Sequence, residues 1–377
     1  MGDDIGLVES GRSGAPRHGR PRHWPWVTAW LASALCSAAL AAASPPPNVG
    51  TAPTVVDTAG APSELEQQSR ALERASQSVV GIQVLALEDA RSNATLGRLR
   101  QGSGVVIGND GLILTIGYLV LEADQVQIVL DNDRAVPARV VGYDLASGFG
   151  LLQALAPLRV PSAPLGGSGT LSTDEPLLVA SGGDAGRLSM ARLVSRRSFA
   201  GYWEYRIDGA LFTAPARADH SGAGLFNSRG ELVGIGSLVV AEVRAAAGGD
   251  GTRRPGNMFV PTDLLRPILG ELRSRGTSSA SRRAWLGVNC VEDSGVLHVV
   301  RISGDSPAEA AGLRVGDRIV AIDGSAVDSL DTLWTKLWAG GPAERDVALD
   351  IERDGRRQTV ALRSVDRAQS IRRASGI

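Results

Sequence analysis

The chain has 377 residues and a formal net charge of −1, so it has room for two domains but no basic surface for nucleic acid. Its 46 glycines and 4% aromatic content favour a β-rich protein with many tight turns over a helical bundle. No histidine or cysteine pair has metal-ligand spacing, so we expect neither a metal nor any other cofactor.

The N-terminus has the pattern of a membrane segment. Residues 1–23 are polar and basic, and residues 24–43 form an uncharged run of about the length that spans a bilayer. Tryptophans cluster at the start of this run, where indoles favour the membrane interface. We predict a single-pass anchor in the inner (cytoplasmic) membrane, with residues 1–23 in the cytoplasm and the bulk of the chain periplasmic or otherwise extracytoplasmic. The alternative is a signal peptide cleaved near Ala43, which would release the chain into the periplasm.

A linker and a helix follow. Residues 44–62 are rich in proline and alanine and are typical of an extended linker. Ser63 is the expected N-cap of a helix that ends at residue 77, with Leu65 and Leu72 on its apolar face.

The next segments are short, apolar and evenly separated by turn residues, which indicates antiparallel β-barrels. The first barrel is expected to use strands at residues 78–85, 104–107, 112–115, 125–130, 136–142 and 150–154. A second barrel is expected over about 163–261, closed by a helix at 261–275 with Thr262 as its N-cap. Together these segments form one predicted domain, residues 63–275.

After a Ser/Arg linker at 276–283, residues 284–366 form a separate unit, followed by a tail at 367–377. The segments G-D-S-P-A-E-A-A-G-L and G-D-R-I-V-A-I-D-G and a helix at 329–338 resemble a bacterial PDZ domain of α+β class.

The PDZ resemblance implies a peptide site. It places backbone N–H groups of Leu286, Gly287 and Val288, beside Trp285, around the terminal carboxylate of a bound peptide. Trp334, on the helix, is the candidate for the opposite wall. The implied partners are polypeptide C-termini or unfolded proteins.

The segment A-D-H-S-G-A-G at 218–224 contains Ser221 and leads into two short strands. It resembles the nucleophile turn G-N-S-G-G-P of the HtrA/DegP family of serine proteases, which also carry C-terminal PDZ domains. The resemblance covers roughly residues 65–366. It implies a mainly β, two-barrel trypsin-like (chymotrypsin-fold) domain followed by the PDZ domain.

The resemblance also shows which catalytic positions are altered. Where the family carries its histidine base, this chain has Tyr118, and a phenol is already protonated at neutral pH. Gly148 stands where the family has the aspartate that orients the histidine. Ser221 is therefore expected to be a vestigial nucleophile.

The oxyanion hole is altered as well. Asp219 replaces the glycine two residues before the serine, and its carboxylate would repel a developing oxyanion. His220 adjoins Ser221, but neighbouring side chains in a tight turn point apart, so we do not expect it to act as a base.

We therefore predict a membrane-tethered pseudoprotease that binds peptides or proteins outside the cytoplasm through its PDZ domain. Homo-oligomers, or association with an active relative, would fit this role. The alternative is an active serine endopeptidase of the HtrA/DegP family that works in envelope protein quality control. A third hypothesis is an adaptor whose barrels only space the PDZ domain.

Overall fold

The computed structural model describes residues 63–130, 134–173, 175–183, 186–243 and 254–371. The predicted anchor at 24–43 and the linker at 44–62 lie outside these residues. Within the described ranges, no helix combines the length and the apolar character that a membrane crossing requires.

The first element is α1, Glu64–Gln77. Its start is set by a reciprocal capping box, in which Ser63 accepts from the Glu66 amide and the Glu66 side chain accepts from the Ser63 amide. The predicted helix and its cap are therefore present. Leu65 does not lie on the buried face, however, because 78% of its surface is exposed.

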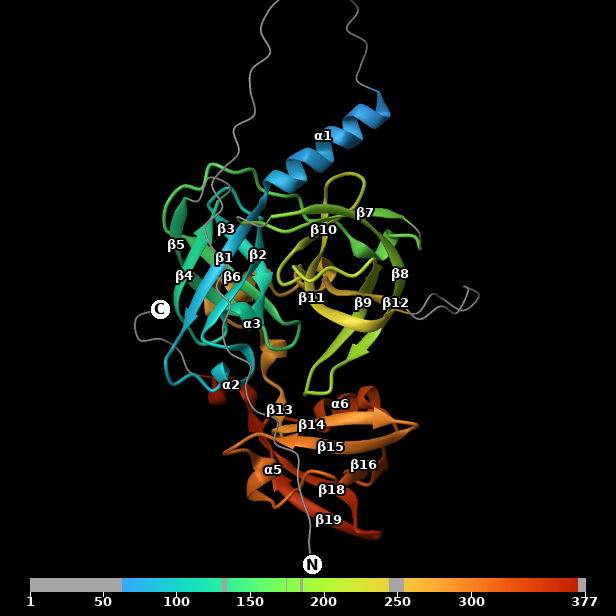
Figure 1. Cartoon of the computed structure of the whole chain (residues 1–377). Coiled ribbons are helices and arrows are strands. Elements are labelled where there is room, and N and C mark those ends of the chain that lie inside the picture. The colour runs from blue at the N-terminus through green and yellow to red at the C-terminus, as the bar shows by residue number, and fades with distance from the viewer. Residues whose placement is uncertain (1–62, 131–133, 174, 184–185, 244–253, 372–377) are drawn as a thin grey trace, which may run out of the picture. The chain divides into compact units, whose positions relative to one another are not determined.

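The first barrel closes in the strand order β1-β2-β3-β6-β5-β4 (Figure 1). Its strands are β1 Val79–Ala86, β2 Leu99–Val106, β3 Leu112–Ile116, β4 Ala123–Val129, β5 Ala135–Tyr143 and β6 Phe149–Ala154, with the short helices α2 Asn93–Leu96 and α3 Gly117–Val120. The predicted strand at 125–130 corresponds to β4, in which Val126 and Ile128 are buried while Gln125 and Gln127 are exposed.

The second barrel closes in the order β10-β11-β12-β9-β8-β7. Its strands are β7 Pro176–Ala180, β8 Leu188–Ala200, β9 Arg206–Ala214, β10 Gly224–Phe226, β11 Leu232–Val243 and β12 Arg254–Pro261, preceded by the 3-10 turn η1 Ser168–Thr170. Apolar side chains of both barrels join in one buried core.

The predicted closing helix at 261–275 is wrong in its first half. A 3-10 turn, η2 Thr262–Leu264, comes first, and the helix α4 spans only Leu269–Arg275. Pro267 explains the break, because it lacks an N–H and disfavours helical geometry in the residue before it. Thr262 is not an N-cap: its hydroxyl donates to the carbonyl oxygens of Gly166 (3.1 Å) and Leu232 (3.2 Å).

The C-terminal unit contains a sheet in the order β14-β15-β16-β18-β19, with β17 paired to β16, and a small β13–β20 pair. Its elements are β13 Ala284–Trp285, β14 Val288–Asp293, β15 Val296–Ile302, α5 Pro307–Ala310, β16 Arg318–Ile322, β17 Ser325–Ala326, α6 Leu330–Ala339, β18 Asp346–Arg353, β19 Arg356–Arg363 and β20 Val365–Asp366, flanked by η3 Ser279–Ser281 and η4 Arg367–Ser370. The predicted fold class, two trypsin-like barrels followed by an α+β PDZ unit, is confirmed.

Candidate active site

Ser221 lies in the turn between β9 and β10, and backbone contacts fix that turn. The Ser221 carbonyl accepts from the Ser103 amide at 2.8 Å, and the Gly222 amide donates to Gly236 at 2.9 Å. Gly222 has φ +75°, and a Cβ built there would collide with the Ser103 carbonyl oxygen. Only glycine fits this position, so the turn presents the serine in one defined way.

Tyr118 faces this serine from α3, the single turn that follows β3. Its phenol oxygen lies 2.7 Å from Ser221 Oγ and 2.9 Å from the Ser237 carbonyl oxygen, so the phenol proton is shared between two acceptors. Desolvation raises the pKa of Tyr118 to about 12, although the hydrogen bond with Ser221 opposes the shift. At neutral pH the group next to the serine is therefore a proton donor.

Gly148 lies in the loop between β5 and β6, and its carbonyl accepts from the amide of Gly117, next to Tyr118, at 2.6 Å. Its φ is +79°, and a Cβ added there would lie 2.7 Å from the Tyr205 phenol oxygen. Tyr205 is held in place because its hydroxyl donates to the Ser147 carbonyl at 3.0 Å. The space for a carboxylate that would orient a base is filled by the Tyr205 ring.

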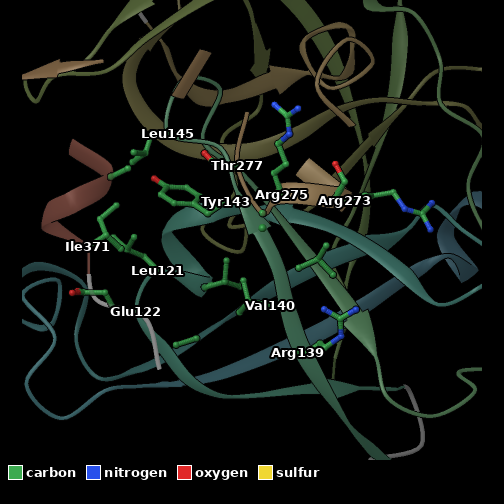
Figure 2. A pocket seen from close by; sticks show the side chains of 17 residues that line it. Leu121, Glu122, Arg139, Val140, Tyr143, Leu145, Arg273, Arg275, Thr277 and Ile371 are labelled. Atoms are coloured by element: carbon green, nitrogen blue, oxygen red, sulfur yellow. The ribbon is translucent and has the colours of Figure 1, made fainter. Parts of the chain in front are cut away.

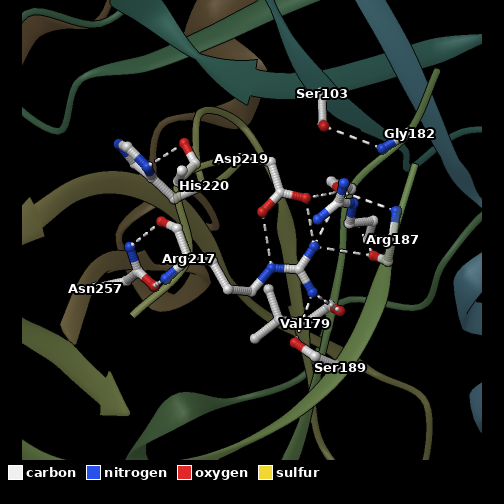
Figure 3. A network of polar contacts seen from close by, with 11 residues as sticks. Ser103, Val179, Gly182, Arg187, Ser189, Arg217, Asp219, His220 and Asn257 are labelled. Carbon is white, nitrogen blue, oxygen red and sulfur yellow. Dashed lines mark hydrogen bonds and ion pairs between the residues drawn. The ribbon is translucent and has the colours of Figure 1, made fainter. Parts of the chain in front are cut away.

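Asp219 is bound to Arg217, two residues before it (Figure 3). The guanidinium donates to its two carboxylate oxygens at 3.0 and 2.5 Å, and the Ser181 hydroxyl donates at 2.6 Å. Burial favours the protonated carboxyl, but these hydrogen bonds outweigh it and lower the pKa of Asp219. The Asp219 carboxylate is thus ion-paired with Arg217 and fixes the turn. Its backbone does not adopt positive φ.

Arg217 is a functional-site residue that the sequence analysis missed. Its guanidinium also donates to the Val179 carbonyl (3.2 Å) and to Ser189 Oγ (2.6 Å), and its backbone exchanges hydrogen bonds with the side chain of Asn257 (Figure 3). The signal in the sequence that could have identified this pair is the Arg-x-Asp spacing at 217–219.

His220 does not turn toward a catalytic partner. Its Nδ1 lies 3.0 Å from the Ala218 carbonyl oxygen, within its own turn. Desolvation lowers the pKa of His220, so the ring is neutral at physiological pH. In the described part of the chain, no group of three or more His, Cys, Asp or Glu side chains has the arrangement of a metal site.

Residues 102–235 match the trypsin-like peptidase domain family, and residues 284–363 match the PDZ domain family. In the order of these two domains the chain resembles the HtrA/DegP proteases. It is 28% identical over 300 residues to a DegP-like periplasmic serine endoprotease of Halomonas elongata, covering 73% of this chain and 58% of the relative. It is 30% identical over 283 residues to a protein of the same description from Pseudomonas fluorescens, covering 69% and 55%. The chain thus spans a little over half the length of these relatives.

The fold of this HtrA/DegP-like protein also has counterparts among solved structures. A variant of the HtrA-type protease AlgW, solved with a tripeptide, matches with a TM-score of 0.50 and 21% identity, covering 80% of this chain and 97% of that chain. This likeness concerns the fold.

The PDZ peptide site of the HtrA/DegP-like protein differs from expectation in two ways. The amides of Leu286, Gly287 and Val288 do converge on a carboxylate, but that carboxylate belongs to Glu204 of the second barrel. Trp285 is half-buried in β13. Trp334 is fully buried, and its indole N–H donates to the Gly201 carbonyl at 2.9 Å.

A cavity of about 330 Å³ lies elsewhere in this HtrA/DegP-like protein (Figure 2). It is lined by residues of β5, of α4 and of the segment after α3, including Val140, Tyr143, Arg273 and Arg275. Neither Tyr118 nor Ser221 lines it, so it is separate from the serine site.

Proposed function

We propose that this protein binds polypeptides outside the cytoplasm and does not cleave them, so that its trypsin-like domain is a pseudoprotease. The observation that carries the proposal is the 2.7 Å contact between the phenol of Tyr118 and Ser221 Oγ. A serine hydroxyl becomes a nucleophile when a neighbouring base accepts its proton. Here the neighbouring group is the phenol of Tyr118, which keeps its own proton at neutral pH because its pKa is about 12.

Two further features support an inactive site. Tyr205 fills the space at Gly148 that an orienting acid would need. The Arg217–Asp219 pair anchors the turn at the position where an oxyanion would require a free amide donor. Base, acid and oxyanion stabiliser are thus altered together.

The proposed location is the periplasm or another extracytoplasmic space, with the segment 24–43 as an inner-membrane anchor. The similar DegP-like proteins are described as periplasmic, and the charge pattern of the N-terminus supports the same topology. The proposed partners are polypeptide C-termini or unfolded proteins at the PDZ domain, and further copies or an active relative at the barrels.

Active endoproteolysis remains the second candidate. The turn around Ser221 is fully formed, with Gly222 at φ +75°, and the similar DegP-like proteins are described as serine endoproteases. In this reading a base other than histidine would activate Ser221.

Labelling with a fluorophosphonate probe separates the two candidates. The purified chain from residue 63 onward is incubated with the probe and with unfolded casein, beside its Ser221→Ala variant and an active DegP-like protease. We expect no labelling and no cleavage for this chain. Labelling or casein cleavage that disappears in Ser221→Ala would establish the active protease instead.

A further inference from the structure

The loop between β8 and β9 contacts β14 of the PDZ domain, the strand to which a peptide ligand would add. We call residues 201–205 of this loop, the sequence G-Y-W-E-Y, the internal ligand. Trp203 pairs with Asn289 of β14 as an antiparallel bridge, and the Cys290 amide donates to the Tyr202 carbonyl at 2.6 Å. Residues 201–205 form a tight turn, closed by a 2.8 Å hydrogen bond from the Gly201 amide to the Tyr205 carbonyl, and this turn bridges β14 at the edge where a peptide ligand would add as a strand.

The end of the internal ligand meets the carboxylate-binding loop. Glu204 Oε1 accepts from the amides of Leu286 (3.1 Å), Gly287 (2.7 Å) and Val288 (3.1 Å), and Oε2 lies 3.1 Å from the Leu286 amide. Glu204 is only 5% exposed. Gly287 has φ +85°, which lets the loop curl around the carboxylate. The side chain of Glu204 thus takes the position of a peptide's terminal carboxylate.

The helical wall of the groove contacts the same segment. Trp334 of α6 donates to the Gly201 carbonyl at 2.9 Å, and Arg206 pairs with Asp331 of α6 at 2.7 Å. From the C-terminal side, Arg367 donates to the Glu204 carbonyl at 3.0 Å. The segment is therefore held by the strand, the loop and the helix of the groove at once.

We propose that residues 201–205 are an internal ligand of the PDZ domain, and that Glu204 must leave the loop before the C-terminal carboxylate of another polypeptide can bind. The competing ligand class is an extended peptide with a free C-terminal carboxylate. This inference rests on the proposed peptide binding by the PDZ domain.

Because the internal ligand is tethered to the PDZ domain, we expect it to occupy the carboxylate-binding loop in preference to free peptides at ordinary concentrations. A segment joined to its site by a short connection acts at an effective concentration on the order of millimolar. A free peptide of roughly micromolar affinity also loses conformational entropy on binding, whereas the internal segment is largely ordered by β8 and β9. The expected reduction in apparent peptide affinity is about tenfold or more.

The first test removes the Glu204 carboxylate in a chain that begins at residue 63. The probe is a fluorescent decapeptide pool ending in Val, Leu or Phe with a free carboxylate, and the same pool with amidated ends measures carboxylate dependence. Glu204→Ala should bind the free-acid pool about tenfold or more tighter than the unmodified chain. The control Glu88→Ala removes an exposed glutamate of the first barrel and should change nothing.

The second test locks the internal ligand in place, which does not depend on how well Glu204→Ala folds. Trp203→Cys with Asn289→Cys joins the bridge partners by a disulfide, and antiparallel partners lie within the distance a disulfide spans. The oxidised variant should not bind the pool, and dithiothreitol should restore binding. Cys290 is buried and can stay unchanged.

Hydrogen exchange of the Leu286, Gly287 and Val288 amides separates this inference from the proposed function. Without any peptide, these amides should lose protection in Glu204→Ala. Unchanged protection would overturn the internal ligand itself. Lost protection with equal peptide affinity, or with no binding in either form, would overturn its competition with free C-termini, and so would equal binding by the oxidised and reduced disulfide variant.

Discussion

The phenol oxygen of Tyr118 lies 2.7 Å from the hydroxyl oxygen of Ser221, in the place where a trypsin-like protease needs a proton acceptor. The contact is short enough to be a hydrogen bond, and burial keeps the phenol protonated. Under the proposed function, Ser221 is well positioned but lacks a neighbouring base to activate it.

Raising the pH should not activate Ser221 as a nucleophile. Because the pKa of Tyr118 is raised to about 12, the phenol stays protonated between pH 7 and pH 10. Fluorophosphonate labelling of the chain should stay at background across this range, and Tyr118→Phe should behave the same. Labelling that increases about tenfold per pH unit would instead identify Tyr118 as a base with an ordinary phenol pKa.

Restoring the orienting carboxylate should fail because of Tyr205. A non-glycine residue held at positive φ is expected to cost about 1–3 kcal/mol. Gly148→Ala should destabilise the protein by more than this, because its Cβ would lie 2.7 Å from the Tyr205 phenol oxygen. Gly97→Ala is the matched control, with φ +73° and no heavy atom closer than 3.9 Å. Denaturant unfolding should rank Gly148→Ala as the costlier change.

The same experiment has an internal check. Tyr205→Phe removes the oxygen nearest to that Cβ and should recover part of the loss in Gly148→Ala. If the double variant is no more stable than Gly148→Ala, Tyr205 does not block this position. If the recovery is seen, an attempt to restore catalysis by Tyr118→His, Gly148→Asp and Asp219→Gly also needs a smaller residue at position 205.

Asp144 is predicted to be a structural carboxylate. It is 1% exposed and accepts from the Ser147 amide (2.7 Å), Ser147 Oγ (2.5 Å) and Ser281 Oγ (2.5 Å), and also from Ser278 Oγ. Asp144→Asn removes the charge and turns an N–H₂ group toward hydroxyl donors, which should cost about 2–3 kcal/mol of unfolding free energy. The exposed Asp346, 3.4 Å from Arg363, is the control, and Asp346→Asn should change stability by less than about 0.5 kcal/mol. Equal losses would contradict the structural role of Asp144.

Peptide binding should strengthen as the pH rises toward 7. Desolvation raises the pKa of Glu204 to about 7, although Arg367 and the three loop amides oppose this. In a released, solvated loop the same carboxyl has an ordinary pKa near about 4.3. The closed state therefore binds a proton between about pH 4.3 and about 7, so closure weakens as the pH rises through this range and becomes independent of pH above it.

The measurement is the affinity for the free-acid decapeptide pool from pH 5 to pH 8. Besides the loop amides, Glu204 faces the Arg367 guanidinium and Cys290, and burial raises the pKa of Cys290 so that it stays a neutral thiol. Glu204→Gln has no titrating group here and should give a flat profile. A flat profile for the unmodified chain as well would show that Glu204 does not titrate in this range.

Local patterns in the sequence were enough for the fold. The N-cap at Ser63, the strand at β4 and the helix after Ser329 depend on neighbouring residues, and the sequence predicts each within one or two residues of its observed place. The predicted closing helix at 261–275 is wrong in its first half because Pro267 interrupts the apolar spacing. The predicted burial of Leu65 is wrong because periodicity indicates one face of a helix but not the point at which the helix leaves the domain.

The sequence identifies the altered catalytic positions of the candidate site but not the residues that surround them. Family resemblance identified the positions of Tyr118, Gly148 and Asp219, but what occupies the space around them comes from distant segments. Tyr205 reaches Gly148 from the other barrel, and Glu204 meets an amide 82 residues further along the chain. Single-sequence spacing carries no information about such pairs.

The internal ligand stands before its PDZ domain in the chain, because residues 201–205 precede β14, Val288–Asp293. Domains emerge from the ribosome N-terminal first and fold largely as units, so the second barrel and its loop are in place when the PDZ domain is completed. The first carboxylate that the new loop at 286–288 meets is therefore Glu204 of the same molecule. If the internal ligand acts as proposed, we expect each copy to fold into the closed state first, and opening to follow in the finished protein.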